Sequence, residues 1–201
     1  MISIMLDRLF ADIPGALVAD FDVGAAIFRQ GDEATAIYQV RTGAVSLVRH
    51  IADGGLLTVA TASAKETFAE ASLFASHYHC DAVARVPSSV LVLPSNAVRA
   101  YLGANPDHAM AFAEFLSGQV RDLRGRFEIL RIKRAPERVM TWLRWRARGD
   151  PPIVDAGDAW SRVASELGLT PEALYRTLSG LEKRGLIQRS GRRIAVIGVK
   201  K

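Results

Sequence analysis

The sequence predicts an α+β fold in three parts: an N-terminal β-roll of the jelly-roll type, one long helix, and a C-terminal winged helix-turn-helix. Three observations support this prediction. Short β-branched and aromatic runs alternate with turn residues between Asp20 and Leu93. A heptad pattern of apolar residues follows Pro106. The remaining chain reads as two helices joined by a sharp turn and followed by a basic hairpin. We expect these parts to occupy residues 1–106, 107–135 and 136–201.

The β-roll is predicted from strand-forming runs that recur about every 8–12 residues. Gly31-Asp32, Thr42-Gly43 and Asp53-Gly54-Gly55 separate them as turns. The expected strands cover residues 26–28, 36–40, 44–48, 56–60, 82–86 and 90–93. The segment from Glu66 to Cys80 lacks alternation, so we expect a short helix there. Because this segment interrupts the roll, it is also the expected place for a pocket.

The long helix is predicted from apolar residues spaced alternately four and three apart. Such a seam is typical of a helix that pairs along its length with another helix. No other segment looks long enough to cover the seam, which favours a homodimer. A helix packed on its own domain is the alternative. Gly118 and Gly125 lie on one stripe, where they would let another backbone approach closely. The seam consists of Ala109, Ala113, Leu116, Val120, Leu123, Phe127 and Leu130.

The helix-turn-helix is predicted from residues that start and stop two short helices. Ser161 is a suitable N-cap for the first helix, and Gly168 closes it. Thr170 caps the second helix, and Pro171 occupies its favoured first position. Ala164, four residues before Gly168, is the small residue that two closely crossed helices require. The second helix is expected over residues 171–184.

The second helix has one apolar and one polar face. Leu174, Leu178 and Leu181 would face inward. A major-groove reader carries its base contacts on the opposite face. Arg176 can donate two hydrogen bonds to a guanine edge. Glu172 can accept one from a cytosine amino group, or it can orient Arg176. An ordinary solvated charge is the alternative for each. With the wing, the predicted DNA-contacting residues are Thr170, Glu172, Tyr175, Arg176, Ser179, Arg189, Arg192 and Arg193.

The wing is expected as a hairpin of two strands, residues 186–189 and 193–197, around Ser190-Gly191-Arg192. Its three arginines would touch phosphate. A solvated basic hairpin is the alternative.

Composition and charge exclude several classes of protein. The 201 residues are 49% hydrophobic, with a formal net charge of +5. Residues 1–106 carry seven basic and ten acidic residues, whereas residues 107–201 carry 19 and 11. The basic half favours nucleic acid as partner over a membrane surface or an acidic protein. No apolar run approaches the roughly 18 residues of a membrane helix, and the start does not resemble a secretory signal. We therefore expect a soluble, cytoplasmic protein.

The order of these parts resembles the CRP/FNR family of transcription regulators over residues 15–198. In the roll the resemblance rests on Gly31-Asp32, on the run Tyr38-Gln39-Val40-Arg41-Thr42-Gly43-Ala44-Val45 and on Phe68-Ala69-Glu70-Ala71-Ser72-Leu73-Phe74, which is similar to the family's G-E-x-x-L-F segment. In the recognition helix, Glu172 and Arg176 match its E-x-x-x-R pattern. A further Arg often precedes that Glu, and here Pro171 replaces it, so the preferred half-site is expected to differ. The resemblance implies a cyclic-nucleotide-binding-like effector domain, a dimerisation helix, double-stranded DNA as partner and contact with RNA polymerase.

The predicted effector pocket departs from the family pattern. Members that bind a cyclic nucleotide carry Gly-Glu, and an Arg-Ser pair follows ten residues after the Glu to hold the phosphate. Here those positions are Ala69-Glu70 and Cys80-Asp81. Because the bidentate Arg is lost and a negative charge is gained, we do not expect the chain to bind a cyclic nucleotide. The candidate pocket residues are Phe68, Glu70, Cys80 and Asp81.

The cysteine and histidine content of the sequence also limits which other cofactors the chain can hold. One cysteine excludes the family's iron–sulfur centre and a multi-cysteine zinc site. Since the family includes a heme-based carbon-monoxide sensor, His77 or His79 is a possible heme ligand, although short histidine clusters are more often loop residues. Cys80 is either a small buried apolar residue or a redox switch.

Two function classes remain open. The favoured one is a homodimeric regulator that reads a palindromic DNA site. The alternative is a ligand-binding module whose winged helix mediates protein contacts. An enzyme is not expected, because no Gly-rich phosphate loop, nucleophile elbow or helical metal-ligand pair occurs.

Overall fold

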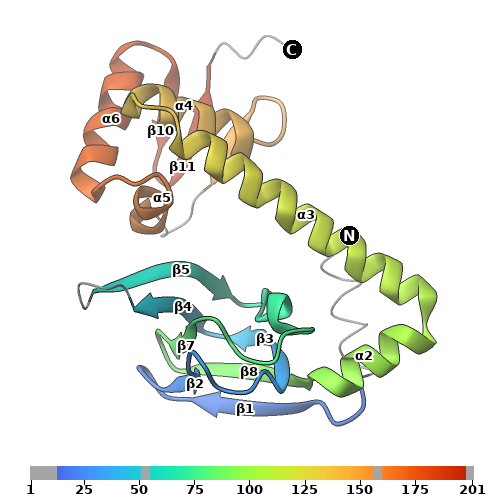
Figure 1. The fold of residues 1–201 in the computed structure, drawn as a ribbon. Coiled ribbons are helices and arrows are strands. Elements are labelled where there is room, and N and C mark those ends of the chain that lie inside the picture. Colours follow the sequence, from blue (N-terminus) through green and yellow to red (C-terminus); the bar gives the residue numbers. More distant parts are fainter. Residues whose placement is uncertain (1–12, 51–54, 156–159, 198–201) are drawn as a thin grey trace. The chain divides into compact units, whose positions relative to one another are not determined.

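The computed structural model describes residues 13–50, 55–155 and 160–197. The chain divides into two compact units, Met1–Leu116 and Ser117–Lys201 (Figure 1). The N-terminal unit is built mainly of antiparallel strands, and the C-terminal unit mainly of helices with a small sheet. The predicted α+β class is therefore confirmed. Among the described residues, no helix combines the length and apolarity needed to cross a membrane.

The N-terminal unit contains two four-stranded antiparallel sheets, which form the layers of a roll (Figure 1). One has the strand order β1-β8-β3-β6 and the other β2-β7-β4-β5. The strands are β1 (Leu17–Phe21), β2 (Ala26–Phe28), β3 (Ala36–Thr42), β4 (Ala44–His50), β5 (Leu56–Ser63), β6 (Thr67–Phe68), β7 (Asp81–Ala84) and β8 (Ser88–Pro94). All six expected strands are present, and β1 and β6 are additional. The helix expected between residues 66 and 80 is a single 3-10 turn, η1 (Glu70–Ser72).

Aromatic rings fill the space between the two sheets. Phe28 stacks on Tyr78 with ring centroids 3.8 Å apart, and Tyr38 stacks on Phe68 at 5.0 Å. The Tyr78 hydroxyl donates to the backbone carbonyl of Ala36 at 2.7 Å and accepts from its N–H at 3.0 Å. Because the buried hydroxyl is satisfied by the backbone of β3, these rings are held rigidly inside the roll.

A second cluster lies where the roll meets the helices α2 (Ser95–Ala104) and α3 (Pro106–Leu130). Val98 of α2 and Phe112 of α3 pack there against Leu93. The seam residues Ala109 and Leu116 also pack against this cluster. The first part of the predicted seam is thus partly covered by the chain's own core.

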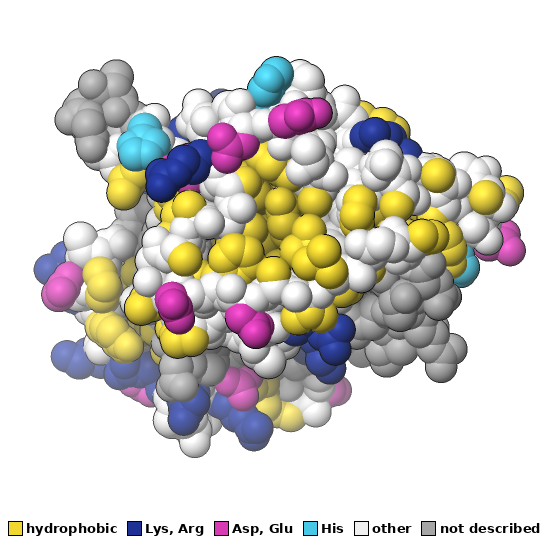
Figure 2. All heavy atoms as spheres, turned by 90° about the horizontal axis from the view of Figure 1, so that it is seen from below, with side chains coloured by type: hydrophobic (Ala, Val, Ile, Leu, Met, Phe, Trp, Pro, Cys, Tyr) yellow, Lys and Arg dark blue, Asp and Glu magenta, His cyan; other side chains and the backbone are white. Residues whose placement is uncertain are grey.

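The outer face of the roll is apolar in its middle. Figure 2 shows hydrophobic side chains gathered there, with charged side chains toward the margins of the face. The middle of the face drawn in Figure 2 offers no basic surface to nucleic acid.

The C-terminal unit has one core beneath three helices and a three-stranded antiparallel sheet of order β10-β11-β9. Its elements are α4 (Ala135–Arg146), β9 (Ile153–Asp155), α5 (Trp160–Glu166), α6 (Pro171–Lys183), β10 (Ile187–Ser190) and β11 (Arg193–Val196). The third strand, β9, was not expected, and it pairs with β11. Gly125 of α3 faces the ring of Trp145, because a Cβ there would lie 3.2 Å from Trp145 Cζ2. The small side chain at Gly125 therefore accommodates α4 of the same chain.

Candidate functional site

The turn between α5 and α6 has the geometry that its sequence predicts. Ala164 is buried, and its carbonyl accepts from the Leu169 N–H at 2.9 Å. Gly168 has a φ of +60°, which an L-residue adopts only at a cost. Thr170 caps α6, because its hydroxyl accepts from the Ala173 N–H at 3.2 Å. These contacts fix the start of α6, while its leucines Leu174, Leu178 and Leu181 are buried in the core.

The opposite face of α6 is open to solvent. Glu172, Tyr175 and Arg176 are exposed, and Ser179 is half-buried on the same face. Hydrogen bonds from its own backbone N–H and from the Thr170 hydroxyl lower the pKa of Glu172. Glu172 is thus held at the N-terminus of α6. Arg176 makes no hydrogen bond or ion pair with any residue that the structure describes, so its guanidinium is available to an external partner.

The predicted wing arginines have different surroundings. Arg189 is half-buried and bonded to Glu182, with its Nη2 2.7 Å from Glu182 Oε2. Arg193 is exposed and forms an ion pair of 3.2 Å with Asp155 of β9. Such an exposed pair contributes little to stability and exchanges readily for another anion. Arg192 is exposed, beside Gly191 at the tip of the hairpin. Arg192 and Arg193 therefore remain candidates for phosphate contact, while Arg189 is held within the protein.

The second half of the predicted seam is uncovered in the single chain. Val120, Leu123, Phe127 and Leu130 are 46%, 62%, 62% and 45% exposed. Exposed large apolar side chains on one helical stripe mark an interaction surface.

A small pocket opens beside η1, where the interruption of the roll predicts one. Its volume is about 100 Å³. Two of the candidate residues, Glu70 and Cys80, line it, whereas Phe68 is buried in the neighbouring aromatic cluster. The remaining lining residues are Phe28, Leu47, Ala69, Ala71, Ser72 and His79. No arginine or lysine is among them.

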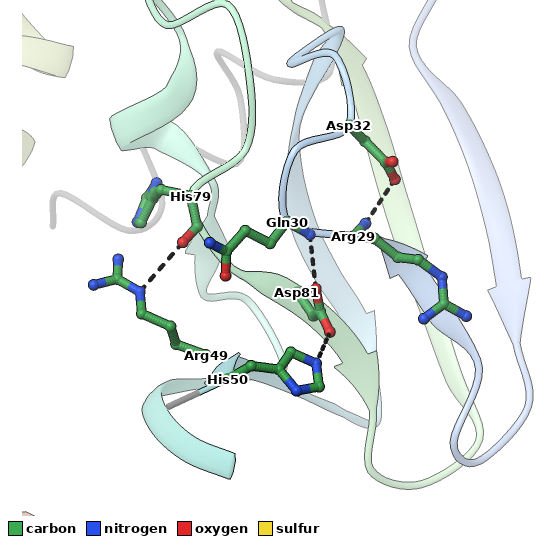
Figure 3. A network of polar contacts seen from close by, with 7 residues as sticks. All are labelled: Arg29, Gln30, Asp32, Arg49, His50, His79 and Asp81. Carbon is green, nitrogen blue, oxygen red and sulfur yellow. Dashed lines mark hydrogen bonds and ion pairs between the residues drawn. The ribbon is translucent and has the colours of Figure 1, made fainter. Parts of the chain in front are cut away.

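Asp81, the fourth candidate, does not line the pocket. Its Oδ1 accepts from the Gln30 N–H at 2.7 Å, and its Oδ2 lies 3.2 Å from His50 Nε2 (Figure 3). The carboxylate thus joins β7 to the turn after β2 and to the end of β4. Sequence reasoning missed this role, because it depends on His50 and Gln30, which are distant in the chain.

Ala69 adopts a left-handed backbone conformation, with φ 63° and ψ 11°. This backbone conformation costs an L-residue about 1–2 kcal/mol, which glycine avoids. Glycine loses part of that gain, because its unfolded chain has more conformational entropy to lose on folding. Ala69→Gly is therefore expected to stabilise the protein by about 0.5–1 kcal/mol and to raise its melting temperature by about 1–4 °C. Thermal unfolding measures this. Ala71→Gly is the control, since Ala71 does not have a positive φ, and it should lower the melting temperature. An unchanged or lower melting temperature for Ala69→Gly would contradict the claim that the backbone at Ala69 is strained.

The histidines and Cys80 give no support to heme or redox chemistry at this pocket. Burial raises the pKa of the Cys80 thiol, so it stays protonated and poorly nucleophilic. His79 is exposed at the pocket, and the exposed His77 has its Nδ1 3.0 Å from the Ser76 hydroxyl. A pocket of about 100 Å³ is too small to enclose a porphyrin. The described residues contain no group of three or more His, Cys, Asp or Glu side chains arranged to hold a metal ion.

Three comparisons place the chain among known proteins. The model of the cyclic nucleotide-binding domain family matches residues 19–105. The global nitrogen regulator of Synechocystis sp. is 26% identical over 200 residues, which cover 94% of this chain and 88% of that protein. The fumarate and nitrate reduction regulatory protein of Escherichia coli is 23% identical, covering 86% of this chain and 72% of that protein. In fold, the chain is similar to FixK2 from Bradyrhizobium japonicum (TM-score 0.66, 24% identity, 91% of this chain and 93% of that one). It is also similar to a CRP-family transcriptional regulator of Thermus thermophilus (TM-score 0.57, 22% identity, 90% and 92%).

Over most of its length the chain is similar to CRP/FNR-type regulators, the family that its sequence resembles, and it contains a cyclic nucleotide-binding domain. These relatives are transcription regulators and not enzymes, which supports transcription regulation as the role of this chain, as the sequence predicts. The family model ends at residue 105, at the start of α3.

Proposed function

We propose that the chain is a homodimeric, sequence-specific DNA-binding regulator that reads a palindromic site through the recognition helix at residues 171–184. The observation that supports this most directly is Arg176. Its guanidinium is exposed on the outer face of α6, and no described residue satisfies it. A helix held by its caps and its buried leucines presents that group in the way a major-groove reader requires.

Dimerisation is proposed along α3. The four exposed seam residues from Val120 to Leu130 would be covered by the same stripe of a second copy. A two-fold dimer places its recognition helices about 34 Å apart, or a multiple of that, on successive major grooves. RNA polymerase is the further partner that the family resemblance implies.

The pocket is proposed not to bind cyclic AMP. Neither an arginine nor a lysine is among its lining residues, and its volume of about 100 Å³ is below the roughly 300–1,000 Å³ of pockets that bury drug-sized ligands. The hydroxyl of Ser72, one of the lining residues, is buried and lacks a hydrogen-bond partner among the described residues.

Calorimetric titration of the protein with cyclic AMP or cyclic GMP is expected to give no saturable heat, corresponding to a Kd weaker than about 1 mM. The variant Cys80→Arg is the comparison, since Cys80 lines the pocket and an arginine there would supply a guanidinium for the phosphate. Micromolar binding to the unmodified chain would contradict the proposal.

Selection of binding sites from random double-stranded DNA tests the proposed function itself. We expect an enriched two-fold symmetric sequence whose half-sites are about one helical turn apart, or a multiple of that. If no sequence is enriched, while the protein still captures a protein partner through residues 160–197, the winged helix is a protein-interaction module.

A further inference from the structure

We infer that Arg189 positions the wing against the recognition helix and does not bind DNA phosphate. Its Nε donates to Glu182 Oε2 at 2.8 Å, and its Nη2 lies 2.7 Å from the same oxygen. Its backbone N–H donates to the other oxygen, Glu182 Oε1, at 2.9 Å. Nη2 also donates to the Ser179 hydroxyl at 3.3 Å. Ser179, Glu182 and Arg189 are called the clamp below. The inference rests on the proposed DNA-reading function.

The clamp joins the two elements that must meet DNA in a fixed relation. Ser179 and Glu182 follow Arg176 along α6 at successive intervals of three residues, so each lies about one turn beyond the residue before it. Arg189 belongs to β10, the edge strand of the sheet β10-β11-β9. The clamp therefore ties the free edge of the wing to the helix two turns from the proposed base-reading residue.

The charges of the clamp compensate each other. Glu182 lies in the last turn of α6, where a carboxylate interacts unfavourably with the helix dipole. Near DNA it would also repel phosphate. Arg189 neutralises it, and both side chains are about one-third exposed, at 33% and 35%. The hydrogen bonds from the Arg189 side chain and backbone lower the pKa of Glu182, so the pair stays ionised at neutral pH. An arginine whose charge is already balanced adds little attraction for phosphate.

The geometry also requires an arginine. The Nε and Nη2 donors reach Glu182 Oε2 together, and Nη2 reaches Ser179 as well. A lysine has the same charge but presents it as a point and cannot form this fork. Lysine would preserve a phosphate contact, whereas it would break the clamp. This difference separates the two roles.

The test compares Arg189→Lys and Glu182→Gln with the unmodified full chain, by DNA-binding anisotropy on the selected palindrome and on random DNA over a salt series. We expect each variant to reduce the preference for the palindrome about fivefold to tenfold. The slope of log affinity against log salt should stay unchanged, because no phosphate contact is lost. The double variant should lose no more than either single variant, since both break the same contacts. Arg192→Gln is the matched control at the wing and should instead lower the slope.

Opposite results would overturn the inference. If Arg189 binds phosphate, Arg189→Lys should behave like the unmodified chain, and Arg189→Gln should lower the salt slope by about two for a dimer. Removing the carboxylate in Glu182→Gln should then strengthen binding to both DNAs equally. Thermal unfolding of each variant shows whether a loss of binding comes from unfolding, and Ser179→Ala provides a milder change at the same clamp.

A DNA-independent measurement distinguishes failure of the clamp from failure of the proposed function. The Arg189 amide is expected to exchange its hydrogen slowly in the unmodified chain and at least about tenfold faster in Glu182→Gln, because the carboxylate covers the edge of β10. Fast exchange in the unmodified chain would overturn the clamp, whatever the protein binds. Slow exchange without any palindrome preference would contradict the proposed function and leave no role for Arg189 in reading DNA.

Discussion

Replacing Arg176 with alanine is expected to remove about 1–3 kcal/mol of base discrimination from each half-site, because a bidentate contact to guanine is lost. The affinity for random DNA and the salt slope should change little. Arg176 is exposed and unbonded among the described residues, so the stability of the fold should stay within about 0.5 kcal/mol.

Competition anisotropy with palindromes altered at single positions measures this effect. The lost discrimination should be confined to one base pair in each half-site. Lys183→Ala is the control, since it removes an exposed positive charge from the end of the same helix. Equal losses on the palindrome and on random DNA would show that Arg176 contacts only the phosphate backbone.

Replacing Leu123 with aspartate is expected to convert the dimer to a monomer at micromolar concentration and to abolish binding to the palindrome. The side chain is 62% exposed in the single chain, so the substitution should not disturb the core of the monomer. In a paired helix it places two charges in an apolar seam without partners. A monomer holds only one recognition helix and loses the second half-site.

Sedimentation velocity with the unmodified chain and the variant measures the oligomeric state. Met110→Asp is the matched control, because Met110 is 70% exposed on the same helix but lies outside the heptad stripe. It should remain a dimer. A dimeric Leu123→Asp variant with unchanged DNA binding would show that the exposed part of the seam is not the dimer interface.

Features fixed by local signals were predictable from the sequence. The start of α6 follows from Thr170 and Pro171, and the end of α5 from Gly168, because caps and turns act within a few residues. The predicted N-cap Ser161 is wrong, because α5 already includes it and begins at Trp160. The long helix follows in the same way from its heptad spacing. By contrast, α2 buries few apolar side chains, chiefly Val98 and Leu102, so its pattern gives little helical signal.

Features fixed by tertiary contacts were not predictable. Asp81 was expected at the pocket, but its partners Gln30 and His50 lie 51 and 31 residues away and draw its carboxylate elsewhere. Arg189 was expected to contact DNA phosphate, because basic hairpins often contact DNA. Glu182 precedes it by only seven residues, yet one residue is helical and the other extended. Neither the helical period nor the strand period predicts that the two side chains meet, so only the packing of β10 beside α6 reveals the pair.

The most direct test of this account is fluorescence anisotropy of the ligand-free protein on the selected palindrome and on a scrambled sequence of equal length, across a salt series. We expect the palindrome to bind at least about a thousandfold more tightly, with affinity falling steeply as salt rises. Equal, weak affinity for both sequences would contradict the claim that this chain reads DNA by itself. A flat salt dependence would contradict phosphate contact and favour a winged helix that binds protein.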